Sequence, residues 1–367
     1  MPTFRYANPA VIHWGEGCVA ESLGRELDRV RASRVLLVTT SSVGKDPHLG
    51  PAVEALLGGR LAARFAAVPQ HTPVRAVVEA TRAAQAAGVD ALVSIGGGSP
   101  IDAAKAVAFS LASGLDLAAP DAPARARALK IDRALPHVAI PTTLSVAELS
   151  CAAGFSAEGT REKVGVGAPP LCPSAVLYDA ALAVRTPLPL WLSTGIRAVD
   201  HAVETLLAPG EHPLPDAAAL EGLRRLEAGL LACRQRPDDP GPRTECQLGA
   251  WFSYLLPGPA ASGLGHTLGK RLGSRHGIPH GVTSCLLLPH VVRAVAPRHS
   301  TAAARIAEAL GGTDAADALA GLIADLGLPR RLSAWGLSDA DLVEAARPLV
   351  GPEHGEEELV GILRAAL

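Results

Sequence analysis

The chain has 367 residues, of which 48% are hydrophobic, and this is enough for two domains that each have a buried core. Its formal net charge of −2 argues against a nucleic-acid-binding protein. No apolar run reaches the roughly 18 residues that a membrane span needs, and we expect no signal peptide because the first residues lack a basic and an apolar region. Six scattered cysteines contain no CxxC pair, so we expect free thiols in a cytoplasmic protein.

Short apolar runs alternate with helical patterns in the first half of the chain. Buried strands are predicted at 34–40, 63–69, 90–99 and 135–143. Between the second and third runs, residues 73–87 place their apolar side chains on one helical face. This alternation is typical of a parallel, doubly wound, Rossmann-like sheet.

After about residue 185 the pattern changes to long helical periods rich in Ala, Leu and Arg, with no run typical of a strand. Helices are predicted at 193–207, 214–235, 243–256, 300–311, 313–326, 338–347 and 355–366. We therefore predict an α/β domain over residues 1–184 and an all-helical domain over residues 185–367.

Three consecutive glycines, Gly96, Gly97 and Gly98, separate a predicted strand from a helical pattern. At the carboxyl end of a parallel strand, glycines leave backbone N–H groups bare, and the N-terminus of the next helix adds partial positive charge. Ser99 can cap this helix, and Asp102 lies where a carboxylate is favourable. An ordinary tight turn needs fewer glycines, so we expect a diphosphate to bind here, although the spacing is not G-x-G-x-x-G.

The stretch GGGSPIDAAK resembles the motif of the iron-containing alcohol dehydrogenase superfamily, and the resemblance covers nearly the whole chain. Within it, IPTTLSVAELS (140–150) and HTPV (71–74) are more similar to the maleylacetate reductase branch. The resemblance implies a dehydroquinate synthase-like architecture, an α/β domain followed by a helical domain, with NADH or NADPH bound between them. It also implies an oxidoreductase that acts on a small molecule, and a homodimer.

The resemblance also implies which residues bind the nucleotide: Thr39, Thr40, Gly96, Gly97, Gly98, Ser99, Asp102, Thr142, Thr143, Ser145, Lys163 and Leu182. The glycines and Ser99 would hold the diphosphate, and Lys163 would lie near the cofactor ribose and the substrate. Many relatives carry an aspartate near Thr40 that binds the ribose 2′-hydroxyl. Without that carboxylate a 2′-phosphate is not repelled, so NADPH can be accepted as well as NADH. The alternative for Thr39 and Thr40 is a capping or turn role.

Metal-dependent members of the superfamily bind a divalent ion through one aspartate and three histidines. His201, His266 and His280 match the histidine positions, but Arg197 stands where the aspartate belongs. A guanidinium opposes a divalent ion by several kcal/mol even at an effective dielectric of about 20, so we expect no divalent metal. Retained metal binding stays an alternative, because three histidines alone can hold zinc and Asp200 is a candidate displaced ligand.

The candidate catalytic residues are Lys163, Arg197, His201, His266, Lys270 and His280. Arg197 would polarise a carbonyl or pair with a substrate carboxylate, and a histidine would donate the proton. Lys270 would add charge or a proton, or else lie on a solvated helix face.

The sequence therefore predicts a metal-independent NAD(P)H-dependent reductase that transfers hydride to an activated carbonyl or a conjugated oxo-acid, similar to maleylacetate reductase. Three alternatives stay open: an iron- or zinc-dependent alcohol dehydrogenase, an aldehyde or ketone reductase of specialised metabolism, and a non-catalytic NAD-binding protein. The first two are favoured by GIPHGVTSCLLLPH (277–290), which is more similar to the general alcohol dehydrogenase branch.

Overall fold

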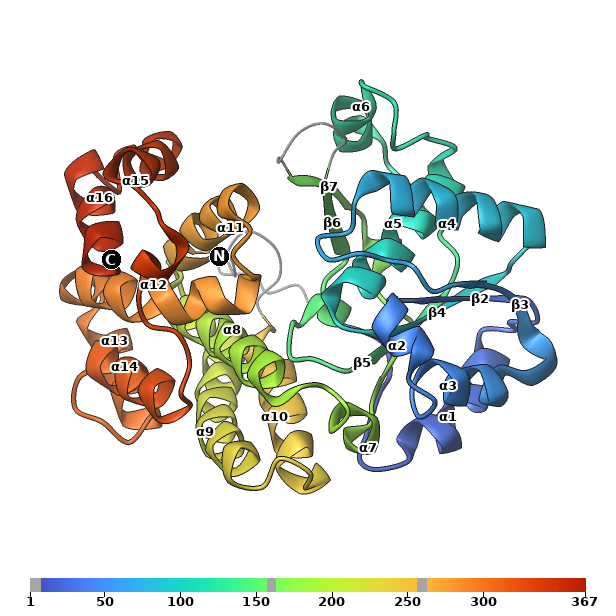
Figure 1. Cartoon of the computed structure of the whole chain (residues 1–367), viewed down its shortest axis with the longest axis horizontal. Coiled ribbons are helices and arrows are strands. Elements are labelled where there is room, and N and C mark those ends of the chain that lie inside the picture. The colour runs from blue at the N-terminus through green and yellow to red at the C-terminus, as the bar shows by residue number, and fades with distance from the viewer. Residues whose placement is uncertain (1–7, 157–162, 256–262) are drawn as a thin grey trace. The chain divides into compact units, whose positions relative to one another are not determined.

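The structure is a computed structural model of the whole chain, and it describes residues 8–156, 163–255 and 263–367 (Figure 1). The chain divides into two compact units between Thr186 and Pro187, which we call the α/β unit and the helical unit. Within the described ranges, no helix combines the length and the apolar character needed to cross a membrane.

The α/β unit is built on a six-stranded sheet in the order β1-β8-β5-β4-β2-β3, with every neighbouring pair parallel. The strands are β1 (Ile12–Trp14), β2 (Val35–Thr39), β3 (Leu61–Phe65), β4 (Ala91–Gly96), β5 (His137–Pro141) and β8 (Ala175–Tyr178). The predicted parallel sheet is confirmed. The sequence analysis missed β1 and β8, because strands of three and four residues carry too little pattern to detect.

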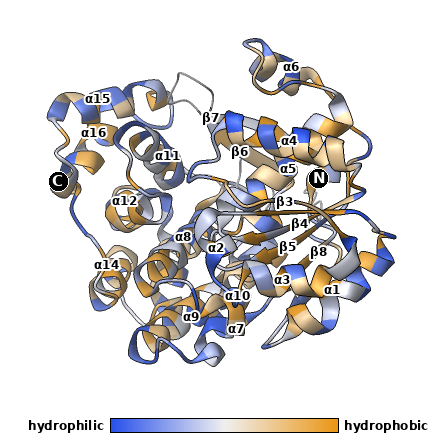
Figure 2. Ribbon diagram, turned by 45° about the vertical axis from the view of Figure 1, so that its right-hand side comes forward, coloured by the Kyte–Doolittle hydropathy of each residue, from blue (hydrophilic) through white to orange (hydrophobic). Residues whose placement is uncertain are grey.

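Helices cover both faces of this sheet. They are α1 (Cys18–Arg29), α2 (Ser41–Lys45), α3 (Gly50–Leu57), α4 (Val74–Ala87), α5 (Gly98–Ser113), α6 (Ala122–Ala128) and α7 (Ala180–Ala183). Alternate residues of β2 face opposite cores: Leu36 and Val38 pack with α4 and α5, whereas Val35 and Leu37 pack with α1 and α3. Figure 1 shows these helix pairs on the two sides of the sheet, and Figure 2 shows the apolar strands between them.

An antiparallel hairpin packs against α5 and was not predicted. Its strands are β6 (Ala152–Ser156) and β7 (Lys163–Gly167), with Ala152 opposite Gly167. Ala153 and Phe155 are buried in the same core as α4 and α5, so one face of the hairpin extends that core. The hairpin follows directly on the segment 142–150, which the sequence analysis assigned to the cofactor.

The described part of the helical unit contains helices and no strand, as predicted. They are α8 (Leu188–Leu207), α9 (Pro213–Gln235), α10 (Pro240–Ser253), α11 (Leu264–His276), α12 (His280–Val295), α13 (Ser300–Ala309), α14 (Ala315–Asp325), α15 (Asp339–Ala346) and α16 (Glu356–Ala365). Helix α8 is buried along most of its length, including Asp200, His201 and Glu204 but not Arg197.

The sequence analysis missed α11 and α12 as helices, although it selected residues on both. Glycines recur at every fourth position of α11, and Pro289 lies inside α12, so neither segment shows a strong helical signal. The glycines have a packing role. A Cβ atom on Gly269 would lie 2.9 Å from Thr283 Oγ1, and one on Gly273 would lie 2.9 Å from the Ile278 carbonyl oxygen. Small residues therefore let α11 approach α12 closely.

Candidate functional site

The glycine turn joins β4 to α5 in the α/β unit. Gly96 has φ of +137°, a conformation that side chains with a Cβ rarely adopt, and a Cβ there would lie 2.9 Å from Pro100 Cγ. Helix α5 begins at Gly98 with Gly97 as its N-cap, and no side chain caps it. The predicted capping role of Ser99 is therefore wrong, because Ser99 lies inside the first turn. The uncapped N–H groups of this turn suit an anionic group.

The segment after β5 lies directly against the glycine turn. The backbone N–H of Thr142 donates a hydrogen bond to the Gly96 carbonyl at 2.8 Å. A Cβ on Gly97 would lie 3.2 Å from Thr143 Cγ2 and 3.3 Å from Thr143 Oγ1. Two stretches more than forty residues apart in the sequence are thus brought together, as expected for one nucleotide site.

Two hydroxyls in this segment are buried without a partner. Thr143 Oγ1 and Ser145 Oγ form no hydrogen bond to any described residue, and Ser145 Oγ would lie 3.2 Å from a Cβ on Gly98. Val146, next in the chain, has φ of +55°, which is strained for a β-branched residue. Unpaired buried hydroxyls beside bare backbone and a strained residue fit a site that is completed by a polar ligand.

The threonines at the end of β2 are engaged within the protein. Thr39 is fully buried, and its hydroxyl donates to the Ile95 carbonyl at 2.8 Å. Thr40 is the N-cap of α2, where its side chain accepts a hydrogen bond from the Val43 N–H. The Thr40 contact matches the capping alternative, whereas Thr39 links β2 to β4 and is neither a cap nor a turn residue. A role toward the adenosine ribose stays a prediction.

For three other predicted cofactor residues, the structure shows positions or contacts outside the glycine turn. Asp102 Oδ2 accepts a hydrogen bond from the Gly154 N–H at 3.3 Å, which ties α5 to β6. Leu182 lies on α7, half-buried against the core that contains α1. Lys163 is the first residue of β7, and its side chain lies outside the described structure.

A buried polar cluster that the sequence analysis did not single out supports the segment 142–150. Lys105 Nζ, fully buried on α5, donates to the carbonyls of Ala147 and Ala152. Tyr178 donates its hydroxyl hydrogen to Glu148 Oε1 at 2.8 Å. Burial raises the pKa of Glu148 to about 7, against the opposing effects of its hydrogen bonds and of the Lys105 charge. The only sequence signal for this cluster is a lysine and a glutamate inside the two motifs.

His137 has a structural role. Its Nε2 is 2.7 Å from Ser94 Oγ on the neighbouring strand, and burial lowers its pKa to about 3. The ring is therefore neutral at physiological pH.

In the helical unit, a second polar cluster forms around one face of α8. Arg197, His201 and Glu204 recur at helical spacing, and Asp200 lies between them. Asp200, His201 and Glu204 are buried, whereas Arg197 and His266 of α11 are partly exposed. Within this cluster, exposed surface is thus limited to Arg197 and His266.

The shortest contact in this cluster joins the arginine to a histidine. Arg197 Nη2 donates to His266 Nδ1 at 2.7 Å. Burial, the Arg197 charge and neighbouring histidines hold the pKa of His266 well below its usual range, so the ring is neutral. The His201 ring centre lies 5.4 Å from that of His266 and 4.9 Å from that of Tyr254. Arg197, His201 and His266 therefore form one group, as the sequence analysis expected.

The other two predicted residues lie at its edge. His280 is the first residue of α12, and its Nδ1 would lie 3.8 Å from a Cβ on Gly273. Lys270 is one turn after His266 on α11, and its side chain is exposed to solvent. Its position matches the solvated-face alternative, although its charge contributes to lowering the pKa of His266.

Sequence reasoning missed Glu204, which positions α11. Glu204 Oε1 accepts the backbone N–H groups of His266, at 2.8 Å, and of Gly263, the N-cap of α11. Its other oxygen is buried and forms no hydrogen bond within the described chain. Burial and the nearby Asp200 charge raise the pKa of Glu204 well above its usual value. The signal in the sequence was its place seven residues after Arg197, on the same helix face.

Asp200 is also buried and only partly satisfied. Its Oδ2 accepts the Ser284 hydroxyl at 2.7 Å, while its Oδ1 lacks a hydrogen-bond partner in the described residues. Burial raises its pKa, and the positive charge of Arg197 acts in the opposite direction. The charges of Asp200 and Glu204 in turn favour the charged form of the Arg197 guanidinium.

The donor set does not fit the metal site that the resemblance implies. His201, Glu204 and His266 do offer ligand atoms within 4.8 Å of one another. However, the aspartate of the implied site is replaced by Arg197, whose guanidinium is hydrogen-bonded to one of the histidines. A divalent ion placed on His266 would be repelled by this fixed positive charge.

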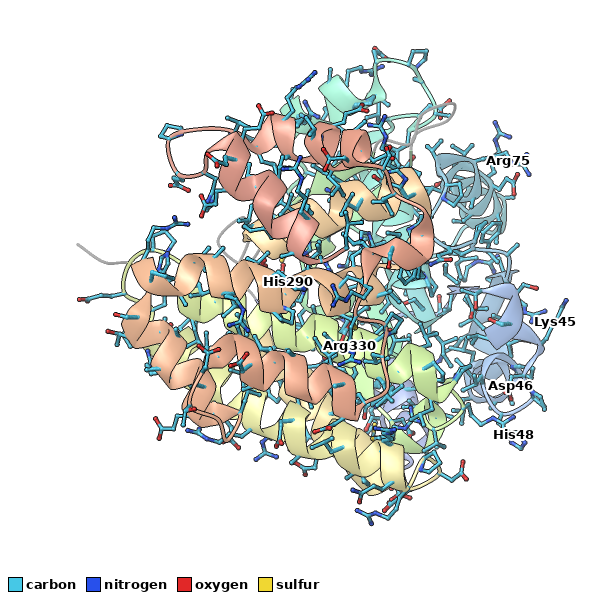
Figure 3. The ribbon with its side chains drawn as sticks, turned by 60° about the vertical axis from the view of Figure 1, so that its left-hand side comes forward. Lys45, Asp46, His48, Arg75, His290 and Arg330 are labelled. Atoms are coloured by element: carbon cyan, nitrogen blue, oxygen red, sulfur yellow. The ribbon has the colours of Figure 1, made fainter. Side chains whose placement is uncertain are left out.

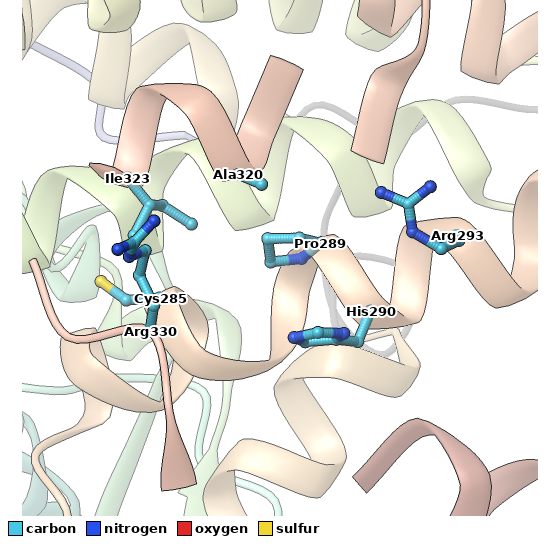
Figure 4. A pocket seen from close by; sticks show the side chains of 7 residues that line it. All are labelled: Cys285, Pro289, His290, Arg293, Ala320, Ile323 and Arg330. Atoms are coloured by element: carbon cyan, nitrogen blue, oxygen red, sulfur yellow. The ribbon is translucent and has the colours of Figure 1, made fainter. Parts of the chain in front are cut away.

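A separate small pocket in the helical unit is not part of this cluster (Figures 3 and 4). It is lined by Cys285, Pro289, His290, Arg293, Ala320, Ile323 and Arg330, and none of these is a predicted site residue. Arg293 is paired with the Asp317 carboxylate at 2.6 Å. Figure 4 shows its side chain at the opposite end of the pocket from Arg330, so the basic groups do not converge on one point.

Comparison with known proteins places the chain in a family. Residues 9–180 match the iron-containing alcohol dehydrogenase family, and residues 191–354 match the C-terminal region of the Fe-containing alcohol dehydrogenase family. The chain is 32% identical over 346 residues to a maleylacetate reductase from Rhizobium sp. (strain MTP-10005), covering 93% of this chain and 90% of that protein. The chain belongs to the iron-containing alcohol dehydrogenase family. It is accordingly an NAD(P)-dependent oxidoreductase.

Solved structures agree with this placement. The crystal structure of maleylacetate reductase from Agrobacterium tumefaciens matches with a TM-score of 0.84 and 30% identity, over 100% of this chain and 99% of that one. A 1,3-propanediol oxidoreductase matches with a TM-score of 0.89 at 24% identity, over 100% of both chains, which supports the fold alone. The predicted fold class and family are therefore confirmed.

Proposed function

We propose that this family member is a metal-independent reductase that uses NADH or NADPH to reduce an activated carbonyl or a conjugated oxo-acid. The observation that carries the proposal is Arg197, which replaces the expected carboxylate ligand and donates to His266 at 2.7 Å. The similarity to maleylacetate reductases supports the substrate class.

The α/β unit supplies the nucleotide site. We assign the diphosphate to the glycine turn, where the first N–H groups of α5 carry no side-chain cap. Thr143 and Ser145, whose buried hydroxyls have no partner in the described chain, are assigned to the nicotinamide side. When bound, the reduced nicotinamide supplies a hydride to the electron-poor carbon of the substrate.

Arg197 supplies the positive charge that orients the substrate. Its side chain is partly exposed, and among the described residues only its Nη2 contacts His266. We assign the remaining N–H donors to a substrate carboxylate, which a guanidinium binds in a two-pronged manner. The charges of Asp200 and Glu204 favour the charged form of this side chain. A substrate that carries a carboxylate is favoured over a neutral one.

His266 stabilises the oxygen that gains negative charge. Arg197 Nη2 lies 2.7 Å from His266 Nδ1 and 3.3 Å from Nε2; with the nearer Nδ1 as the acceptor, the neutral ring carries its hydrogen on Nε2. That N–H can donate to the substrate oxygen as negative charge develops on that oxygen. The low pKa of His266 keeps the ring neutral, so it does not add a second cation beside Arg197. His201, whose ring lies 5.4 Å away, and His280 are the candidates for delivering the proton.

A second candidate is a metal-dependent alcohol dehydrogenase. It is favoured by one observation, the closeness of ligand atoms from His201, Glu204 and His266. In that case Arg197 would have to turn away from His266, and Glu204 would replace the missing aspartate as the anionic ligand.

Elemental analysis of the purified protein, with activity measured before and after chelation, separates the two candidates. We expect less than stoichiometric iron and zinc, and NADH-dependent reduction of unsaturated oxo-acids that persists with chelator. NADH binding is measured first by fluorescence titration, so that a wrong substrate is distinguished from a failed nucleotide site. Stoichiometric metal with chelator-sensitive turnover would favour the metal-dependent enzyme.

A further inference from the structure

Two cysteines lie at the open end of the β6–β7 hairpin. Cys151 directly precedes β6, and its carbonyl oxygen accepts the Ala168 N–H at 3.1 Å. This bond continues the ladder beyond the pair formed by Ala152 and Gly167. The hairpin register therefore holds residue 151 beside the chain that leaves β7.

A single turn brings the second cysteine back to the first. Residues Pro169–Leu171 form a short 3₁₀ helix, in which the Leu171 N–H donates to Ala168 at 2.9 Å and the Cys172 N–H to Pro169 at 3.2 Å. Each of the two thiols shifts the pKa of the other through a side-chain hydrogen bond. Both cysteines are free and partly exposed to solvent.

The two thiols differ in their electrostatic surroundings. The hydrogen bond from Cys172, together with the charge of Lys105, lowers the pKa of Cys151 to about 7, although burial opposes this. The same contact and burial raise the pKa of Cys172. Lys105 is held nearby because its Nζ donates to the Ala152 carbonyl at 3.0 Å. Cys151 is therefore the nucleophile of the pair and Cys172 is the resolving thiol.

We propose that Cys151 and Cys172 are a modification site for hydroperoxides, which oxidise the pair reversibly to a disulfide. The Cys151 thiolate sulfur attacks one peroxide oxygen, an S–O bond forms, and the O–O bond breaks with release of hydroxide or alkoxide. The peroxide is reduced and the sulfur is oxidised by two electrons to a sulfenic acid. Cys172 sulfur then attacks this sulfur, the S–O bond breaks, and water leaves with the Cys172 proton.

The site is independent of the proposed reduction and lies next to its cofactor segment. Cys151 directly follows the segment 142–150. Lys105 donates one hydrogen bond to the Ala147 carbonyl before Cys151 and one to the Ala152 carbonyl after it. Nothing in the proposed hydride transfer uses either thiol, so the modification can be present whatever the substrate is.

The chain contains a second close pair that serves as an internal comparison. Cys233 on α9 and Cys246 on α10 have their sulfur atoms 3.9 Å apart, yet both are fully buried. If closeness alone decided oxidation, this pair would react as well. Because peroxide needs access to the attacking sulfur, we expect the Cys151 pair to react first.

The test uses the reduced full-length protein, treated with stoichiometric hydrogen peroxide, alkylated and digested with trypsin for mass analysis. We expect the peptides 134–161 and 164–185 to become linked, and dithiothreitol to separate them. Linkage of Cys233 to Cys246 is expected to be at least about tenfold slower. In Cys172→Ser, Cys151 is expected to be trapped as a sulfenic acid that dimedone labels. Cys285→Ser, at a buried thiol outside both pairs, is the matched control that keeps the linkage.

Two results would overturn the proposal. One is that peptides 134–161 and 164–185 stay unlinked in the wild-type protein while other cysteines are oxidised. The other is that Cys151→Ser leaves Cys172 as the labelled residue, which would reverse the assigned roles. The first result needs no variant, so the proposal stays falsifiable if a substitution impairs folding. Melting curves of each variant identify such a case.

Discussion

Replacing Arg197 by methionine tests the central assignment of the polar cluster. Methionine keeps much of the side-chain length but removes the charge and the donors that contact His266. Aspartate would be a poorer choice, because it adds a third carboxyl group beside Asp200 and Glu204, which are already buried together. We expect Arg197→Met to fold, and to lose activity selectively with substrates that carry a carboxylate.

The size of the loss follows from the partly exposed position of the guanidinium. At an effective dielectric of about 20, a carboxylate about 4 Å from this charge is stabilised by about 4 kcal/mol. Desolvation of the substrate removes part of that, so we expect a loss of at least about 2.7 kcal/mol, or about 100-fold in kcat/KM. A neutral aldehyde loses only one hydrogen bond worth about 1 kcal/mol, or roughly fivefold.

The assay compares kcat/KM for an oxo-acid and for a neutral aldehyde, with NADH consumption as the readout. Arg243→Met is the matched control, because Arg243 is another arginine of the helical unit, but it is fully buried and lies over the Trp191 ring at 4.5 Å. We expect that control to lower the melting temperature and to leave the ratio of the two kcat/KM values unchanged. NADH titration confirms that the nucleotide site of each variant is intact.

The reasoning fails if Arg197→Met lowers both kcat/KM values equally, or changes neither. An equal loss would mean that Arg197 acts through the packing of the cluster rather than on the substrate. Unchanged kinetics would remove it from the site.

The remaining predictions concern the two polar clusters and the glycine turn. Glu204→Gln keeps the acceptor for the α11 N–H groups and should retain activity within about threefold. Glu204→Leu removes that acceptor and should lower kcat at least about tenfold. Equal losses in both variants would contradict the capping role. Gly97→Ala should weaken NADH binding at least about tenfold in a fluorescence titration, with little change in the melting temperature, because its Cβ would crowd Thr143. Native Glu148 holds its proton to about pH 7, whereas the unfolded chain releases it near 4.5, so stability falls as pH rises between these values. Urea unfolding at pH 5 and pH 8 should show that Glu148→Gln removes up to about 3 kcal/mol of this fall; parallel pH dependence in both proteins would refute the assignment.

The architecture was largely predictable from the sequence. Strands β2 and β4 are buried on both faces, so they appear as continuous apolar runs between helical patterns, which is typical of a parallel sheet. The elements that were missed carry weak local signals. Strands β1 and β8 are three and four residues long, and α11 uses glycines where a typical helix uses stronger helix formers.

The candidate site was predictable as a set of residues but not as a set of contacts. The motifs placed Gly97 with Thr143, and His201 with His266, in common sites, and the structure brings each pair together. Ser99 was wrongly expected to cap α5, because the sequence does not show at which glycine the helix begins.

The central strands β2, β3, β4 and β5, the bare backbone after β4 and the cation in place of a carboxylate at residue 197 were predictable from the sequence. These follow from local pattern and residue chemistry. The folded structure was needed to show that Glu204 caps α11, that Lys105 donates to the segment 142–150, and that Cys172 lowers the pKa of Cys151. Whether a polar atom finds a partner depends on residues that are distant in the chain. Local sequence patterns do not show which distant residues come together in the fold.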